Sequence, residues 1–216
     1  KPLIEIAILL DTSGSMDGLI NQARTHLWAI VNSMALARKD GQLPELRVAL
    51  YEYGKQSQPA ENGYIRLIVP LSTDLDKISE ELFKLVTDGG DEYCGMVIQK
   101  AVEQLEWTEG DHFRAIFIAG NEPFTQGSVS YEDACKKAIE KSIIVNTIHC
   151  GPEQEGIDGK WRHGAELADG QAMNIDQNEQ TVQIDAPQDA RIAELNGALN
   201  KTYLAYGGER KEKLAR

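Results

Sequence analysis

The sequence Leu3–Leu10, LIEIAILL, runs directly into the turn Asp11–Met16, DTSGSM. A run that is nearly all apolar is typical of a strand buried in a parallel sheet. The turn behind it carries one carboxylate and two hydroxyls at alternate positions, Asp11, Ser13 and Ser15. Carboxylate and hydroxyl oxygens are hard ligands, which suit Mg²⁺ or Mn²⁺ better than thiophilic metals. The stretch therefore predicts a buried strand that ends in a candidate cation site.

Strand-like and helical patterns alternate along the rest of the chain. Further strands are predicted at Leu46–Tyr53, Tyr64–Val69, Phe113–Ala119, Ile143–His149 and, as a short last strand, Ala172–Ile175. Apolar residues recur at helical spacing over 19–34, 75–85, 97–105 and 134–139, which predicts amphipathic helices. Thr73-Asp74 and Ser130 are suitable N-caps for the second and fourth of these helices.

This alternation predicts the class of the fold. Strands that alternate with helices favour an α/β architecture of three layers, a doubly wound and mainly parallel sheet between two layers of helices. Only a polar connection with Pro59 and Gly63 separates Leu46–Tyr53 from Tyr64–Val69. We therefore expect these two strands to form a hairpin, which makes one edge strand antiparallel.

The C-terminal part of the chain is predicted as an extension of the main domain. We expect the domain to cover residues 1–176, and its Gly-rich passage after Gly151 to be a loop that contains Trp161. Residues 177–216 are predicted to form a C-terminal helix, over Asp189–Tyr206, and a charged tail. In an open parallel sheet ligands bind beyond the carboxyl ends of the strands, and the Asp11 turn lies at such an end.

Composition excludes several classes of partner. The chain has 216 residues, with 22 basic and 34 acidic side chains and a formal net charge of −12. Such a surface repels phosphate backbones, so nucleic acid is not an expected partner. No apolar stretch approaches the roughly 20 residues that a membrane span needs. The chain starts at Lys1 without a Met, and we favour an extracytoplasmic location.

The three cysteines, Cys94, Cys135 and Cys150, have no spacing typical of a metal site. Cys135 and Cys150 are close enough in sequence to form a disulfide across a helix and a strand, which only geometry decides. The alternative is that all three are small apolar side chains of the core.

The strand, the pattern Asp-x-Ser-x-Ser at Asp11, Ser13 and Ser15, and the amphipathic helix behind it resemble a von Willebrand factor type A domain of bacterial kind with its metal-ion-dependent adhesion site. The similarity covers residues 3 to 175. It implies a Rossmann-like fold and a divalent cation at this motif. Mg²⁺ is the expected ion, with Mn²⁺ or Ca²⁺ as alternatives.

Two further loops contribute to such sites. One usually carries a Thr after a Gly-Gly pair, and here this loop, Thr87–Glu92, reads TDGGDE. The resemblance therefore implies Asp91 as a ligand, with Thr87 as an alternative oxygen donor. The second loop usually begins with Asp-Gly after its strand, and here Gly120 stands where the Asp is expected.

The absence of that carboxylate defines this site as a variant. Asp91 could restore the number of charges, and Asn121 or Glu122 could contribute directly or through water, because Mg²⁺ commonly keeps several waters. The family resemblance implies that the cation takes a carboxylate of a partner protein as its last ligand. The alternative is a structural or regulatory module of a larger assembly, in which the Asp11 turn holds no metal.

Enzymatic activity is not expected. The Ser-containing turn lacks the Gly-x-Ser-x-Gly nucleophile elbow of serine hydrolases and the Gly-Lys-Ser/Thr ending of a phosphate-binding loop. The resemblance to the von Willebrand factor type A family instead implies a divalent-cation-dependent protein-binding, or adhesion, module. The partner's identity and the oligomeric state do not follow from the sequence.

Overall fold

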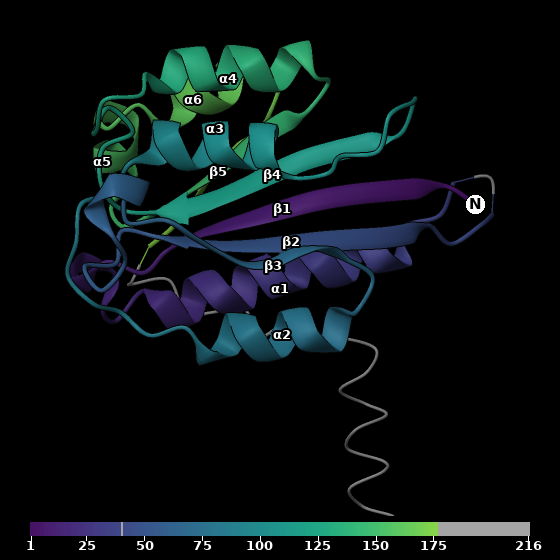
Figure 1. Ribbon diagram of the computed structural model, residues 1–216, viewed down its shortest axis with the longest axis horizontal. Coiled ribbons are helices and arrows are strands. Elements are labelled where there is room, and N and C mark those ends of the chain that lie inside the picture. Colours follow the sequence, from purple (N-terminus) through teal and green to yellow (C-terminus); the bar gives the residue numbers. More distant parts are fainter. Residues whose placement is uncertain (40, 177–216) are drawn as a thin grey trace, which may run out of the picture. The chain divides into compact units, whose positions relative to one another are not determined.

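The computed structural model describes residues 1–39 and 41–176 of the chain, which lie in one compact unit, 1–180. A second unit, 181–216, contains the predicted C-terminal helix and tail and lies outside the described residues. The first unit is built on a six-stranded sheet in the order β3-β2-β1-β4-β5-β6 (Figure 1). The strands are β1 Leu3–Asp11, β2 Glu45–Tyr53, β3 Arg66–Ser72, β4 Phe113–Gly120, β5 Ile144–Cys150 and β6 Ala172–Ile175.

Two layers of helices cover the sheet, as the alternating pattern predicts. The helices are α1 Ile20–Leu36, α2 Leu75–Lys84, α3 Cys94–Gln104, α4 Tyr131–Glu140, α5 Glu153–Asp158 and α6 Trp161–Leu167. Helices α1 and α2 lie on one face of the sheet, and α3, α4 and α6 lie on the other (Figure 1). The predicted three-layer α/β fold is therefore confirmed.

Strand β1 lies in the middle of the sheet and supplies both cores. Its neighbours β2 and β4 both pair with it in parallel. Successive side chains of a strand point to opposite faces, so Ala7 and Leu9 join the core under α3 and α4, whereas Ile8 and Leu10 join the core under α1 and α2. This two-sided burial explains why the run is almost entirely apolar. Because β1 is a central strand, its last residue, Asp11, lies in the middle of the end of the sheet where the parallel strands terminate.

The antiparallel edge strand is confirmed, but it begins later than predicted. Strand β3 pairs with β2 in antiparallel register and lies at the edge of the sheet. Gly63 and Tyr64 both have positive φ angles, 70° and 58°, so the chain is still turning at the position where the strand was expected to begin. Both predicted caps are present, since Asp74 and Ser130 accept hydrogen bonds from the third backbone N–H that follows each of them.

The loop predicted after Gly151 is wrong, because the chain forms α5 and α6 there. The glycines that suggested a loop are instead required by close packing. A Cβ atom on Gly156 would lie 2.7 Å from Cγ of His149, and one on Gly164 would lie 2.7 Å from Cε1 of Phe124. Trp161 is the first residue of α6 and is buried, with 1% of its surface exposed.

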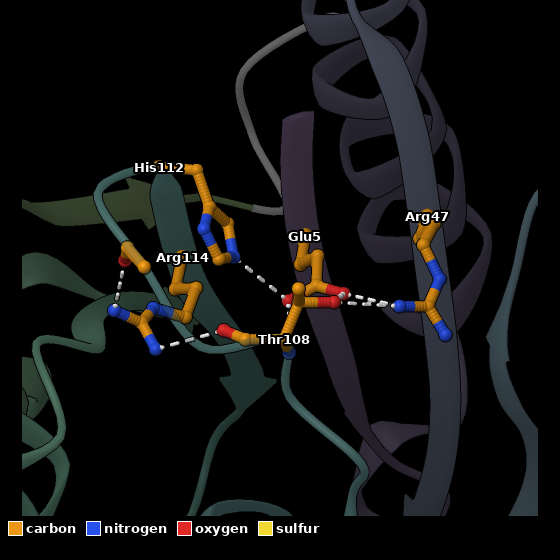
Figure 2. Close-up of polar contacts among 6 residues, drawn as sticks. Glu5, Arg47, Thr108, His112 and Arg114 are labelled. Carbon is orange, nitrogen blue, oxygen red and sulfur yellow. Dashed lines mark hydrogen bonds and ion pairs between the residues drawn. The ribbon is translucent and has the colours of Figure 1, made fainter. Parts of the chain in front are cut away.

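A buried ionic cluster around Glu5, near the start of β1, joins β1 to β2 and to the connection before β4 (Figure 2). Glu5 is fully buried and accepts hydrogen bonds from Arg47 on β2, from the backbone and hydroxyl of Thr108, and from Nε2 of His112. Burial alone would raise the pKa of Glu5, but these donors lower it below its usual value. Glu5 therefore stabilises the fold as an ionised, fully paired group.

No helix in the described part of the chain is long and apolar enough to cross a membrane.

Candidate metal centre

Asp11 is the last residue of β1 and lies where the central strands of the sheet end. Its side chain is fully buried. Oδ1 accepts a hydrogen bond of 2.8 Å from the backbone N–H of Ser13, a local pattern common for Asp in turns. Oδ2 is also buried, and it has no hydrogen-bond partner among the described residues. One oxygen thus holds the turn, and the other forms no hydrogen bond within residues 1–39 and 41–176, although the backbone N–H of Asn121 is near enough to lower the pKa of Asp11.

The hydroxyls of the motif form a row next to Asp11. The oxygens of Ser13 and Ser15 lie 3.0 Å apart, and Ser15 donates a hydrogen bond of 3.0 Å to Oδ1 of Asn121. Because each hydroxyl has a single hydrogen, Ser15, which donates to Asn121, can only accept from Ser13, and the Ser13 hydroxyl also lies within hydrogen-bond reach of the carboxyl groups of Asp11 and Glu92. Lone pairs on both serine oxygens remain available for a ligand. The structure therefore brings Asp11, Ser13, Ser15 and Asn121 together.

The second loop lies against the motif, and the carboxylate of Asp91 in this loop is hydrogen-bonded to Tyr93. The backbone N–H of Asp88 donates to the carbonyl of Thr12 over 2.9 Å, which fastens the loop to the turn. Thr87 is half-buried, whereas Asp91 is exposed. Oδ2 of Asp91 accepts a hydrogen bond of 3.1 Å from the hydroxyl of Tyr93.

Glu92, the next residue, is a member of the site that sequence reasoning missed. Only 7% of its surface is exposed. Three side chains converge on the position that a Cβ atom on Gly54 would occupy. That position lies 3.1 Å from Cγ of Glu92, 2.8 Å from Oδ1 of Asp11 and 3.3 Å from Cβ of Ser13. The one available signal was that Glu92 precedes the apolar face of a helix, where a buried position is expected.

Gly120 leaves no room for a side chain. A Cβ atom there would lie 2.5 Å from the hydroxyl oxygen of Tyr53 and 2.9 Å from Oδ2 of Asp11. Tyr53 is the last residue of β2, pairs with Asp11 in the sheet and donates a hydrogen bond of 3.1 Å to the carbonyl of Ala119. Its hydroxyl thus occupies the space in front of the end of β4.

Glu122 lies at the border of the site. Oε2 of Glu122 accepts a hydrogen bond of 3.2 Å from Gln126, and its carbonyl accepts one of 2.9 Å from the indole N–H of Trp161. Its negative charge is close enough to raise the pKa values of both Asp11 and Glu92. Trp161 of α6 therefore holds the backbone of the third loop in place.

Burial, with a smaller contribution from neighbouring carboxylates, raises the pKa values of both carboxyl groups in the centre. Burial raises the pKa of Asp11 to about 7, and hydrogen bonds from Ser13 offset only part of this effect. Burial, followed by the charges of Asp11 and Glu122, raises the pKa of Glu92 to about 7 as well. Burial also raises the pKa of Tyr53 well above its usual value, so this phenol supplies no negative charge at neutral pH.

The residues fit a small divalent cation by their chemistry. In residues 1–39 and 41–176, no group of three or more His, Cys, Asp or Glu side chains is arranged to hold a metal ion. The centre instead combines two buried carboxylates with two serine hydroxyls, all of them hard oxygen ligands. The unpartnered Oδ2 of Asp11 is the feature that a cation would satisfy.

The cysteines take no part in such a centre. All three are free thiols and fully or almost fully buried, which decides against the Cys135–Cys150 disulfide. Burial raises the pKa of Cys135 and of Cys150 to about 12, and that of Cys94 still further. Only thiolates are good nucleophiles and metal ligands, so the predicted core role of the cysteines is supported.

Comparison with known proteins identifies the family. The family model described as von Willebrand factor type A domain matches residues 5–163. No curated protein matches the chain.

Solved structures share the fold. One is the conserved hypothetical protein BatB from Bacteroides thetaiotaomicron, with 18% sequence identity and a TM-score of 0.61 over 92% of this chain and 100% of that one. Another is an aerotolerance-related membrane protein from Bacteroides fragilis, with 15% identity and a TM-score of 0.56 over 92% of this chain and 100% of that one.

A third is proximal thread matrix protein 1 from the mussel byssus, whose metal-ion-dependent adhesion site is occupied by zinc. It has 11% identity and a TM-score of 0.57 over 89% of this chain and 46% of that one. At these identities the similarities show the fold alone.

Proposed function

This chain belongs to the von Willebrand factor type A domain family, a family of protein-interaction modules, and from that premise we propose that it is a divalent-cation-dependent binding module. The observation that carries the proposal is Oδ2 of Asp11, which is buried without a hydrogen-bond partner beside two serine hydroxyls. A cation bound there would keep open or water-filled positions, because Mg²⁺ commonly retains several waters. A carboxylate of a partner protein then becomes its last ligand.

The acidic surface makes this attraction local. With a net charge of −12, the chain as a whole repels an acidic partner, so the cation must provide the attraction at short range. The loops around the ion then determine which partner fits, since specificity is a difference between affinities. The module binds without catalysis.

One observation favours a second candidate function, a structural or regulatory module whose site holds no metal. The row from Ser13 through Ser15 to Asn121 is already connected by hydrogen bonds of 3.0 Å. A turn of this kind holds its shape without a cation. The two candidates differ at Oδ2 of Asp11, which forms no hydrogen bond in the described part of the chain. A bound cation satisfies this buried oxygen in the first candidate, and nothing satisfies it in the second.

We place the module outside the cytoplasm. Support comes from similar structures, which include a membrane protein of Bacteroides fragilis and a pilus adhesin of Lactobacillus rhamnosus GG.

The cation is tested by thermal unfolding of the protein with EDTA, Mg²⁺, Mn²⁺ or Ca²⁺. A ligand that binds only the folded state stabilises it by about 2.7 kcal/mol at a hundredfold excess over its Kd, which raises Tm by about 5 °C or more in a domain of this size. Asp11→Ala should abolish the shift. Asp17→Ala, an exposed position behind the motif, is the matched control and should retain it. An unchanged Tm of the wild type with all three ions would contradict the proposal.

Capture of a carboxylate is tested with acetate as the smallest probe. Paramagnetic Mn²⁺ held by the wild type should accelerate the NMR relaxation of ¹³C-acetate that enters its coordination shell. Asp11→Ala should give only the effect of free Mn²⁺. If acetate relaxes equally in both samples although the wild type binds Mn²⁺, the ion is structural and the binding role is wrong.

A further inference from the structure

We propose that Glu92 is the second carboxylate that holds the cation, and that the end of β4 contributes none. This inference rests on the proposed function, because it assigns a ligand to the same cation. It goes further by selecting one residue of the second loop and by explaining why the third loop has no charged ligand.

The position of Glu92 is the first step. Gly54 has a φ angle of 79° and presents no side chain at the point where Asp11, Ser13 and Glu92 converge. Oδ1 of Asp11 and Cγ of Glu92 both lie about 3 Å from that point. The carboxyl group of Glu92 forms a hydrogen bond with the side chain of Ser13, so it is within reach of an ion held by Asp11 and Ser13.

The partners of the buried glutamates are the second step. Three glutamates are buried in the described part of the chain, Glu5, Glu52 and Glu92. Glu5 forms an ion pair with Arg47, and Glu52 forms ion pairs with Lys55 and Arg66.

Among the described residues, neither Glu92 nor its neighbour Asp11 forms an ion pair. A buried carboxylate without a cationic partner is costly. The site therefore lacks the positive charge that the other buried glutamates have, and a divalent ion between Asp11 and Glu92 supplies it.

The other acidic residues nearby are less suitable. Asp91 is exposed and accepts a hydrogen bond from Tyr93. Glu122 is half-buried and accepts one from Gln126. Asp11 and Glu92 together provide two negative charges, which match the charge of one divalent ion.

Tyr53 explains why β4 has no charged ligand. Its hydroxyl oxygen lies 2.5 Å from the place of a Cβ atom on Gly120 and is held there by the carbonyl of Ala119. Any side chain at position 120 would displace the hydroxyl of Tyr53 from its place beside the end of β4. The charge is therefore placed on the second loop, where Glu92 has space.

The experiment is Mn²⁺ binding by isothermal titration calorimetry. It uses the wild type, Glu92→Gln, Asp11→Ala and the matched control Asp91→Asn, which removes the neighbouring charge of the same loop. Glu92→Gln should weaken Mn²⁺ binding by roughly tenfold or more, because even residues behind the ligands change metal affinity by about 10–100-fold. Asp91→Asn should stay within about twofold of the wild type.

The outcomes separate this inference from the proposed function. If the wild type binds no Mn²⁺ and no Mg²⁺, the proposed function is wrong and the role of Glu92 is wrong with it. If Asp11→Ala abolishes binding but Glu92→Gln binds like the wild type, only the role of Glu92 is wrong. A large loss in Asp91→Asn with none in Glu92→Gln would assign the ligand to Asp91.

A second variant guards against misfolding. Glu92→Asp keeps the charge but withdraws the carboxyl group by one methylene. A ligand role predicts weaker Mn²⁺ binding in this variant, with the far-UV circular dichroism and the cooperative melting of the wild type. Folded protein with unchanged affinity would overturn the inference.

Discussion

Gly54 and Gly120 show how single residues determine the distances in the centre. Both allow backbone to approach Asp11 more closely than any side chain would permit. At Gly120 the space is taken by the hydroxyl of Tyr53, and at Gly54 it is taken by a carboxylate oxygen of Asp11 and the Cγ atom of Glu92. The chemistry of the site thus depends on two positions that carry no functional group.

Replacement of Gly54 by Ala tests this role. A Cβ atom would lie 2.8 Å from Oδ1 of Asp11, in a residue with a φ angle of 79°. Gly18→Ala is the matched control, since its φ angle is 85° and nothing lies within 4 Å of the added atom. The control should cost about 1 kcal/mol for its backbone conformation. Gly54→Ala should lower the free energy of unfolding by about 1–3 kcal/mol more than the control, as measured by urea denaturation. Equal losses in the two variants would show that the neighbours of Gly54 accommodate the added Cβ atom at no cost.

Glu92→Gln should stabilise the protein when no cation is present. Burial and the charges of Asp11 and Glu122 raise the pKa of Glu92 in the folded state to about 7, from a usual value of 4.5. A raised pKa means that the folded state loses stability as pH rises from the unfolded value through the folded one. In EDTA at pH 8 the variant should therefore melt a few degrees above the wild type, and the difference should vanish near pH 4. A variant that melts lower at pH 8 would show that the Glu92 carboxylate is already neutralised.

At the scale of elements, the ends of β1 have opposite electrostatics. Glu5, near its start, is surrounded by donors that lower its pKa, whereas burial raises the pKa of Asp11 at its end. One buried carboxylate is satisfied by the protein, whereas Oδ2 of the other has no hydrogen-bond partner among the described residues. The strand therefore has a structural end and, in the proposed function, a cation-binding end.

The structural end is tested by Glu5→Gln. Loss of the charge leaves Arg47 without its buried partner, which should lower the free energy of unfolding by about 3 kcal/mol at pH 7. A carboxyl group with a lowered pKa contributes its stability above the unfolded pKa and loses it as pH falls through the folded one. The difference from the wild type should therefore shrink on acidification below the usual value of 4.5. Glu45→Gln, at an exposed position of β2, should change little at any pH.

At the scale of the whole molecule, all three thiols belong to the interior. Each is buried, and burial raises the pKa of each. Two of them, Cys94 and Cys135, lie in the core under α3 and α4, and Cys150 lies in the core on the other face of the sheet. Their reactivity therefore reports on opening of the two cores.

A thiol-specific reagent should modify none of the three cysteines in the native protein on the time scale of minutes. In denaturant all three should react, because unfolding exposes them and returns their pKa values to normal. Titration with Ellman's reagent, with and without guanidinium chloride, measures both states. Rapid reaction of a thiol in the native state would show that the core opens locally.

Much of the fold could be predicted from the sequence. The apolar run of β1, the spacing of the helices and the caps at Asp74 and Ser130 all reflect local geometry, and local geometry repeats with periods that are visible in one dimension. The antiparallel edge followed from a connection that contains no α-helix. The short helices α5 and α6 were missed because their glycines serve close packing, which has no local signature.

The sequence by itself determined that Asp11, Ser13 and Ser15 share a turn at the end of a central strand. This follows from their spacing and from the buried strand before them. Only the tertiary structure decided which other groups face Asp11. Adjacent residues of a loop point in different directions, so packing alone turned Glu92 inward and left Asp91 exposed. Likewise, the space in front of Gly120 is filled by Tyr53 from another strand, a contact between positions far apart in the sequence that no local pattern records.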